Sequence, residues 1–93
     1  MIKANEYFGG NVKSLALSAE GGPATVGVMA PGEYEFGTAS LEIMRVISGK
    51  LSVLLPGETS WREFGAETEF TVAAGVKFLV RALEDTAYLC LYR

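Results

Sequence analysis

Side chains that commonly carry out enzyme chemistry are scarce in this sequence. It contains no histidine and a single cysteine, Cys90, so no thiolate can be generated by a neighbouring imidazole. The lack of imidazoles also excludes the histidine clusters that hold most transition metals, because such a site needs several ligands converging on one point. The chemistry available to the chain therefore comes from carboxylates, hydroxyl groups, guanidinium groups and aromatic rings.

Charge and composition narrow the class of partner. The net charge of −3 and the pI of about 4.9 disfavour nucleic acids and anionic membranes, since proteins that bind polyanions display clustered lysine and arginine. No apolar run approaches the roughly 20 residues of a spanning helix, and the N-terminus lacks the pattern of a signal peptide. One cysteine cannot form an intramolecular disulfide, so we expect a cytoplasmic protein.

Length and hydropathy set the expected organisation of the chain. Ninety-three residues can enclose only one core, so we expect a single domain over residues 1–93. The hydrophobic fraction of 49% and the mean hydropathy of +0.25 are high for a small soluble protein. They predict that part of the apolar surface is covered by a second copy, in a homodimer.

Glycine and proline interrupt the chain at short intervals, and the runs between them are too short for typical helices. Several runs alternate apolar and polar residues, as a half-buried strand requires. About nine strands are predicted, at residues 12–18, 25–29, 34–38, 42–48, 51–55, 61–64, 68–72, 78–83 and 87–92. Many short strands indicate a sandwich or a barrel, and the pattern alone does not choose between them.

A spacing of glutamate and glycine resembles the first motif of the cupin family. In that motif two histidines and a glutamate ligate a metal, and six residues separate the glutamate from a glycine. Here Glu42 is followed by six residues and Gly49, while Phe36 and Thr38 stand where the two histidines would be. The resemblance implies that only one of these three ligands is kept.

Residues 70–78 resemble the second cupin motif, with Phe78 in the place of the last histidine. The implied fold is an all-β, single-domain cupin, an RmlC-like jelly-roll barrel. Because Glu42 would be the one surviving ligand, and Mg²⁺ or Ca²⁺ sites with one carboxylate are weak, we predict no bound metal and no cofactor.

A narrower resemblance extends from about residue 5 to the C-terminus. The sequence is similar to the small bacterial pyrimidine/purine nucleoside phosphorylases in the ordered stretches Asn5-Glu6-Tyr7-Phe8, Gly27-Val28-Met29, Gly32-Glu33-Tyr34, Val46-Ile47-Ser48-Gly49, Leu54-Leu55-Pro56 and Tyr88-Leu89-Cys90. The resemblance implies phosphorolysis of a broad range of nucleosides, with phosphate as co-substrate and ribose 1-phosphate as a product, by a metal-free homodimer active in nucleoside salvage.

Strand parity, combined with the cupin motif, gives the candidate site residues. Tyr34, Phe36, Thr38 and Glu42 share the inward face of the first motif, and a further inward face near the C-terminus contains Tyr88. An ionised Glu42 is suited to accept hydrogen bonds from ribose hydroxyls and to stabilise positive charge that develops on the sugar. We expect Glu42 and Thr38 to be the catalytic residues.

Aromatic rings and one arginine are the predicted substrate contacts. Tyr34, Phe36, Phe78 and Tyr88 are expected to enclose the base, and rings without fixed hydrogen bonds to base edges would tolerate both purines and pyrimidines. Arg81 is the predicted phosphate ligand. It lies on the opposite strand face from Phe78, so this role requires a bulge or a site completed at a dimer interface.

A different class of function fits the same residues. Glu42 can be a hydrogen-bonded structural residue, Arg81 a solvated strand residue, and the aromatic rings core. The chain would then be a non-catalytic cupin that binds a small metabolite, since many functions share this fold. A cupin isomerase or dioxygenase is disfavoured because the metal ligands are missing.

Overall fold

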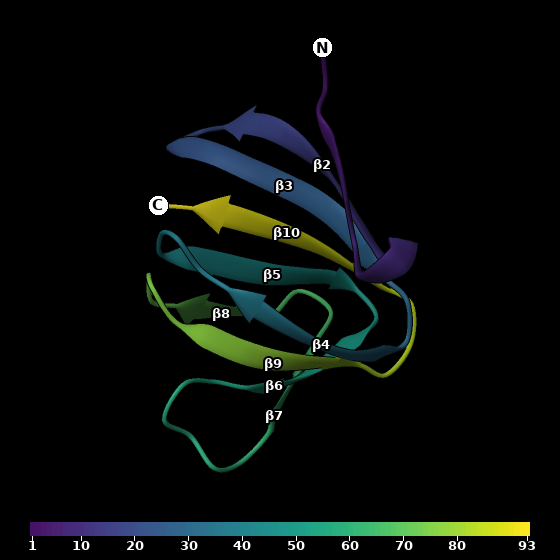
Figure 1. Ribbon diagram of the computed structural model, residues 1–93, viewed down its shortest axis with the longest axis vertical. Coiled ribbons are helices and arrows are strands. Elements are labelled where there is room, and N and C mark those ends of the chain that lie inside the picture. Colours follow the sequence, from purple (N-terminus) through teal and green to yellow (C-terminus); the bar gives the residue numbers. More distant parts are fainter.

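The computed structural model describes all 93 residues, and its regular elements are β-strands joined by short turns (Figure 1). The order is β1 (Ala4–Tyr7), the 3-10 turn η1 (Phe8–Gly10), β2 (Val12–Ala19), β3 (Gly22–Met29), β4 (Gly32–Gly37), β5 (Glu42–Ser48), β6 (Lys50–Leu54), β7 (Arg62–Gly65), β8 (Glu69–Val72), β9 (Lys77–Ala82) and β10 (Thr86–Tyr92). The all-β prediction is confirmed, and β1 is an additional strand that the sequence did not predict. No helix in the structure is long and apolar enough to cross a membrane.

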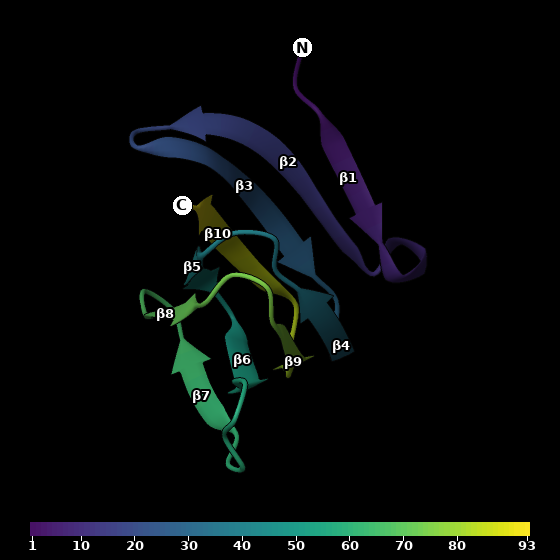
Figure 2. The ribbon, with the colours of Figure 1, turned by 60° about the vertical axis from the view of Figure 1, so that its left-hand side comes forward.

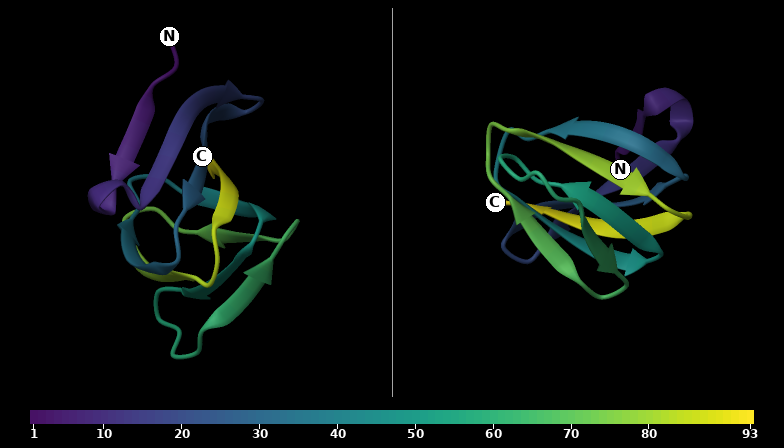
Figure 3. Two further views of the ribbon diagram at one scale, coloured as in Figure 1. Left: turned by 90° about the vertical axis from the view of Figure 1, so that its right-hand side faces the viewer. Right: turned by 90° about the horizontal axis from the view of Figure 1, so that it is seen from below.

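The strands form two antiparallel sheets that enclose the core. The larger sheet has the order β1-β2-β3-β10-β5-β8 and the smaller one the order β4-β9-β6-β7. Seen from below in Figure 3, the sheets curve around a common interior. The chain passes repeatedly from one sheet to the other. Paired strands such as β3 and β10 are therefore far apart in sequence, as in the predicted jelly roll.

Period-two alternation explains how the core is filled. Val12, Met29 and Val46 point inward from the larger sheet, and Val53 and Val80 point inward from the smaller one, each with no exposed surface. Burying a side chain of this size contributes about 1.5–3 kcal/mol. These inward faces hold the two sheets together, and some core side chains, such as Met29, also line a cavity between the sheets.

Gly49 makes the turn between β5 and β6 possible. Its φ of +97° is a conformation that side chains rarely adopt, and a Cβ there would lie 2.5 Å from Oγ1 of Thr86 and 2.6 Å from the carbonyl oxygen of Asp85. Thr86 occupies that space and accepts a hydrogen bond from the Lys50 amide at 3.2 Å. The close approach fixes the position of the turn at which β5 ends and β6 begins.

The N-terminal strands extend beyond the barrel. In Figure 2, β1 and the ends of β2 and β3 project away from the smaller sheet. The outer face of the larger sheet is apolar there: Leu15 pairs with Val26, which pairs with Leu89 of β10. Leu15 and Val26 are 52% and 39% exposed, so this face has no covering layer within one chain.

Candidate active site

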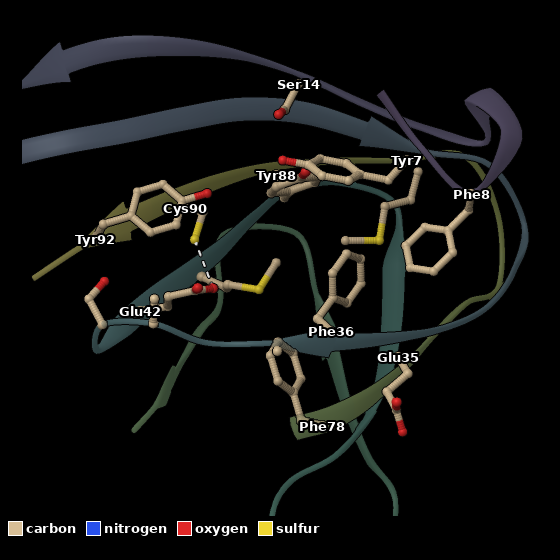
Figure 4. A pocket seen from close by; sticks show the side chains of 15 residues that line it. Tyr7, Phe8, Ser14, Glu35, Phe36, Glu42, Phe78, Tyr88, Cys90 and Tyr92 are labelled. Atoms are coloured by element: carbon tan, nitrogen blue, oxygen red, sulfur yellow. Dashed lines mark hydrogen bonds between the residues drawn. The ribbon is translucent and has the colours of Figure 1, made fainter. Parts of the chain in front are cut away.

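A cavity of about 390 Å³ lies between the two sheets (Figure 4). This volume is within the range of small-molecule sites, which are typically 300–1,000 Å³. It is lined by Tyr7, Phe8, Ser14, Met29, Glu35, Phe36, Gly37, Ala39, Ser40, Glu42, Met44, Phe78, Tyr88, Cys90 and Tyr92. No lysine or arginine is among them, so the walls contain carboxylates, hydroxyl groups, sulfur and aromatic rings.

Aromatic rings form one end of the cavity. Phe36 on β4 lies 5.8 Å from Phe78 on β9, and the ring of Phe8 meets Phe36 edge-on, with centroids 5.4 Å apart. Both β4 and β9 belong to the smaller sheet, where alternate residues point inward. The pairing of Phe36 with Phe78 in the β4–β9 register places the two rings beside each other on this wall.

Glu42 lies at the opposite end of the cavity from Phe8 (Figure 4). It is the first residue of β5 and pairs with Tyr92 of β10. The Cys90 thiol donates a hydrogen bond of 3.4 Å to its Oε1. Burial raises the pKa of the Glu42 carboxyl above its ordinary value of 4.5, and the thiol hydrogen bond opposes this rise. The carboxylate has one protein donor and therefore remains free to accept hydrogen bonds from a ligand.

Neutral hydroxyl groups and a neutral thiol surround Glu42. Burial, reinforced by the negative charge of Glu42, raises the pKa of Cys90 to about 12, so the thiol keeps its proton. Burial likewise raises the pKa of Tyr92, whose hydroxyl lies 3.0 Å from Oγ1 of Thr25. These groups can donate hydrogen bonds but add no charge, so Glu42 is the ionisable carboxylate at this end of the cavity.

The Tyr88 side chain can lie flat along the cavity wall because its pairing partner on β3 is Gly27. A Cβ at Gly27 would lie 2.6 Å from Cζ and Oη of Tyr88 and 2.7 Å from the carbonyl oxygen of Lys13. Without that Cβ, the ring lies over the β3 backbone toward Ser14, which pairs with Gly27 on β2. Burial raises the pKa of Tyr88 to about 12, so its hydroxyl is also a neutral donor.

The structure brings together Glu42, Phe36, Phe78 and Tyr88 of the sequence-predicted site residues, all on the cavity wall. Tyr34 also points inward, but it lies behind the wall. Its hydroxyl donates to the carbonyl oxygen of Ala30 at 2.6 Å, and its side chain is 5% exposed. Parity predicted its direction correctly and could not reveal that other rings stand in front of it.

The structure places Thr38 and Arg81 outside the cavity. The Thr38 hydroxyl donates to the carbonyl oxygen of Ala73 at 2.7 Å and accepts from the Val76 amide at 3.1 Å, so it joins two loops. Arg81 is on the outer face of β9, where its Nε donates to Glu33 at 2.6 Å. The pairing of β9 with β4 and with β6 contains no bulge, so nothing turns Arg81 inward.

Sequence reasoning missed the wall contributed by the N-terminus. Tyr7 and Phe8 reach the cavity from β1 and η1, and Ser14 reaches it from β2. The signal that could have found the first two is an aromatic pair immediately before two glycines. A short segment without apolar alternation carries no strand signal, so the sequence pattern does not place its aromatic residues.

The cavity does not fit the metal of typical cupins. Phe36, Thr38 and Phe78 stand at the ligand positions of the motif and offer no imidazole or carboxylate. No group of three or more histidine, cysteine, aspartate or glutamate side chains comes together in the structure.

Comparisons with known proteins identify the family and support the fold. The family model described as pyrimidine/purine nucleoside phosphorylase matches residues 2–92. The chain is 61% identical over 93 residues to the pyrimidine/purine nucleoside phosphorylase of Pseudomonas putida (strain GB-1), covering 100% of this chain and 99% of the relative. A crystal structure of a protein of unknown function from Vibrio parahaemolyticus has a TM-score of 0.93 and 43% identity, covering 97% of this chain and 96% of that chain.

More distant structures show the fold. A cupin superfamily protein from Desulfitobacterium hafniense has a TM-score of 0.73 at 15% identity, covering 98% of this chain and 82% of that chain. The predicted cupin fold is thus confirmed. Because the family model spans nearly all of the sequence and the relative matches along its whole length, this chain belongs to the pyrimidine/purine nucleoside phosphorylase family.

Proposed function

We propose that this protein is a nucleoside phosphorylase that acts on both purine and pyrimidine nucleosides without a metal or cofactor. The observation that carries the proposal is the half-buried carboxylate of Glu42 in a cavity walled by aromatic rings and lacking any cation. Membership of the family, whose model and relatives are named for this activity, supports it. The products would be the free base and ribose 1-phosphate, and the reaction would serve nucleoside salvage in the cytoplasm.

Glu42 is the residue that would stabilise the transition state. The bond between ribose C1′ and the base nitrogen breaks, the base keeps the bonding electrons, and it takes up the proton that the attacking hydrogen phosphate loses. A phosphate oxygen forms the new bond to C1′, and positive charge develops on the sugar between these events. A carboxylate beside the sugar stabilises that charge and accepts hydrogen bonds from the ribose hydroxyls, most strongly in the transition state.

Neutral donors are the groups available to phosphate inside the cavity. Ser14, Tyr88 and Tyr92 present hydroxyl groups on the larger sheet, and the raised pKa values of both tyrosines keep their protons in place. No lysine or arginine lines the cavity, so these hydroxyl groups would be the hydrogen-bond donors to phosphate. Aromatic walls, with few groups that recognise base edges, are consistent with a broad range of bases.

A homodimer is the assembly that we infer for this protein. The apolar row Leu15, Val26 and Leu89 crosses three neighbouring strands of the larger sheet with no layer over it. An uncovered apolar sheet face is a typical interface between chains. The high mean hydropathy of +0.25 is consistent with an apolar surface that a second chain covers. The expected occupant is a second copy of this chain.

The test is to incubate purified protein with uridine, adenosine or guanosine, with and without phosphate, and to follow free base and ribose 1-phosphate. Phosphate-dependent release of both products is expected, and excess EDTA should leave the rate unchanged. Release of base without phosphate would instead indicate a hydrolase. Nucleoside binding without any release would identify a non-catalytic, small-metabolite-binding cupin, and loss of activity with EDTA would contradict metal independence.

A further inference from the structure

Phe8 is held in an unusual backbone conformation at the mouth of the cavity. Its φ is 54°, in the left-handed region that a bulky side chain rarely occupies. Gly9 and Gly10 follow with φ values of 66° and 93° and allow the chain to turn from β1 into β2. Strained residues of this kind persist where the surrounding structure holds them, and they cluster at ligand sites.

The ring of Phe8 is neither buried nor unpartnered. It is 43% exposed, and its centroid lies 4.9 Å from that of Tyr34 and 5.4 Å from that of Phe36. Phe8 follows β1 of the larger sheet, whereas both partners belong to β4 of the smaller one. The ring therefore bridges the two sheets at the opening of the cavity. A residue serving only the core would be covered and relaxed, and Phe8 is neither.

Figure 4 shows that the cavity has two chemically different ends. Phe8 and Phe36 form an aromatic end, where the Glu35 carboxylate is directed away from the rings, while Glu42, Cys90 and Tyr92 form a polar end. A nucleoside has the same division, since its base is a flat ring system and its ribose carries hydroxyl groups. Aromatic faces attract a base by stacking, and a carboxylate accepts hydrogen bonds from sugar hydroxyls.

We propose that Phe8 is the base-binding residue of this site, and that a nucleoside lies with its base against Phe8 and Phe36 and its ribose toward Glu42. This inference rests on the proposed function and adds to it the orientation of the substrate. Stacking depends on the π-face that every base possesses, so one aromatic residue serves purines and pyrimidines alike. The strain at Phe8 is then explained, because it holds the ring where the base must enter.

The experiment measures the affinity for free adenine, free uracil and ribose 1-phosphate by calorimetry, which requires no turnover. We compare wild type with Phe8→Ala, with Phe8→Trp, and with Leu83→Ala as an exposed apolar control outside the cavity. Replacing the ring by a methyl group should weaken binding of both bases by about tenfold or more. Tryptophan should keep base affinity, and ribose 1-phosphate should bind all variants equally.

A further variant separates a strained binding residue from a structural one. Phe8→Gly removes the ring and suits the positive φ, so it should lose base affinity as Phe8→Ala does and melt at a temperature no lower than that variant. It also replaces Phe8→Ala if that variant fails to fold. Unchanged base affinity in either variant, or equal weakening of base and ribose 1-phosphate, would overturn the inference.

The outcomes also distinguish this inference from the proposed function. If wild type binds adenine but releases no base from nucleosides, the proposed phosphorylase activity is rejected. The base affinities of the Phe8 variants still test the role of Phe8 in that case. If wild type releases base and Phe8→Ala keeps a normal KM for every nucleoside, phosphorolysis stands and the role of Phe8 fails. A wild type that binds neither adenine nor uracil would overturn the inference outright.

Discussion

The Cys90 thiol donates a hydrogen bond of 3.4 Å to Oε1 of Glu42, across the pairing of β10 with β5. The two residues are 48 positions apart in sequence, and the antiparallel register brings them to one wall. This pair is the only direct contact between side chains that would tune the proposed catalytic carboxylate. Because the pKa of the thiol is raised to about 12, it acts as a weak donor and not as a nucleophile.

Glu42→Gln should abolish most of the turnover and leave the fold intact. The amide keeps the size of the side chain but loses the charge that stabilises the developing cation, so kcat should fall by about a hundredfold or more. Steady-state kinetics checks this expectation, and circular dichroism checks the fold. Glu33→Gln is the matched control, since Glu33 is exposed on the outer face. Near-wild-type kcat in Glu42→Gln would reject the catalytic role.

Substitutions at Cys90 should move the acid limb of the pH–rate profile in opposite directions. Activity needs the ionised form of Glu42. Because the pKa of this carboxyl is raised, activity should fall during acidification at a pH higher than the ordinary pKa of 4.5. The thiol hydrogen bond lowers this pKa. Cys90→Val removes the donor, so the limb should move to higher pH, and Cys90→Ser offers a stronger donor, so it should move to lower pH. A limb that stays in place in both variants would show that another group controls it.

Gly27→Ala should lower the stability of the protein although it adds only one methyl group. The added Cβ would meet the Tyr88 ring at 2.6 Å and the Lys13 carbonyl oxygen at 2.7 Å, and the backbone atom cannot move aside. Forced rearrangement of this kind typically costs about 1–3 kcal/mol. Thermal unfolding should show the loss, and nucleoside KM should rise as Tyr88 shifts. Gly65→Ala is the control, because nothing lies within 4 Å of its Cβ. Equal stability of both variants would contradict this packing.

Arg81→Ala should leave the KM for phosphate unchanged. The guanidinium is outside the cavity, where its Nε donates to Glu33 and its Cζ lies 3.9 Å from the centroid of the Trp61 ring. Exposed contacts of this kind contribute about 0.2–1 kcal/mol each, so stability should change little. Kinetics with phosphate varied is the measurement. A raised phosphate KM would contradict this prediction. It would indicate that Arg81 of one chain contacts phosphate in the cavity of its dimer partner.

The sequence was informative wherever parity and turns decide the outcome. Alternation and turn residues predicted the strands other than β1, and parity placed Phe36 and Tyr88 on inward faces, where both line the cavity. Parity also predicted that Arg81 points away from Phe78. The register of β9 with β4 and β6 has no shift, so this prediction is confirmed. Strand parity relates a residue to those two positions away, so it can be read from the sequence without knowledge of the fold.

The remainder of the site depends on long-range geometry. Residues 4–7 have no apolar alternation, so β1 forms because it pairs with β2 and not because of its own pattern. The direction of Phe8 follows from a positive φ, which no sequence pattern of a phenylalanine indicates. Thr38 lies just after the end of β4, where strand parity no longer applies, and two hydrogen bonds to the loop before β9 hold its hydroxyl outside the cavity.

Val26→Lys should convert a homodimer into a monomer. Val26 lies between Leu15 and Leu89 in the apolar row of the larger sheet, so an ammonium group there would be buried against a second copy without a partner. Light scattering after size exclusion should give twice the chain mass of 10.0 kDa for wild type and the single mass for the variant. Leu83→Lys introduces the same charge at an exposed apolar residue elsewhere and should remain dimeric. A monomeric wild type would contradict the homodimer, and a dimeric Val26→Lys would place the interface on another face.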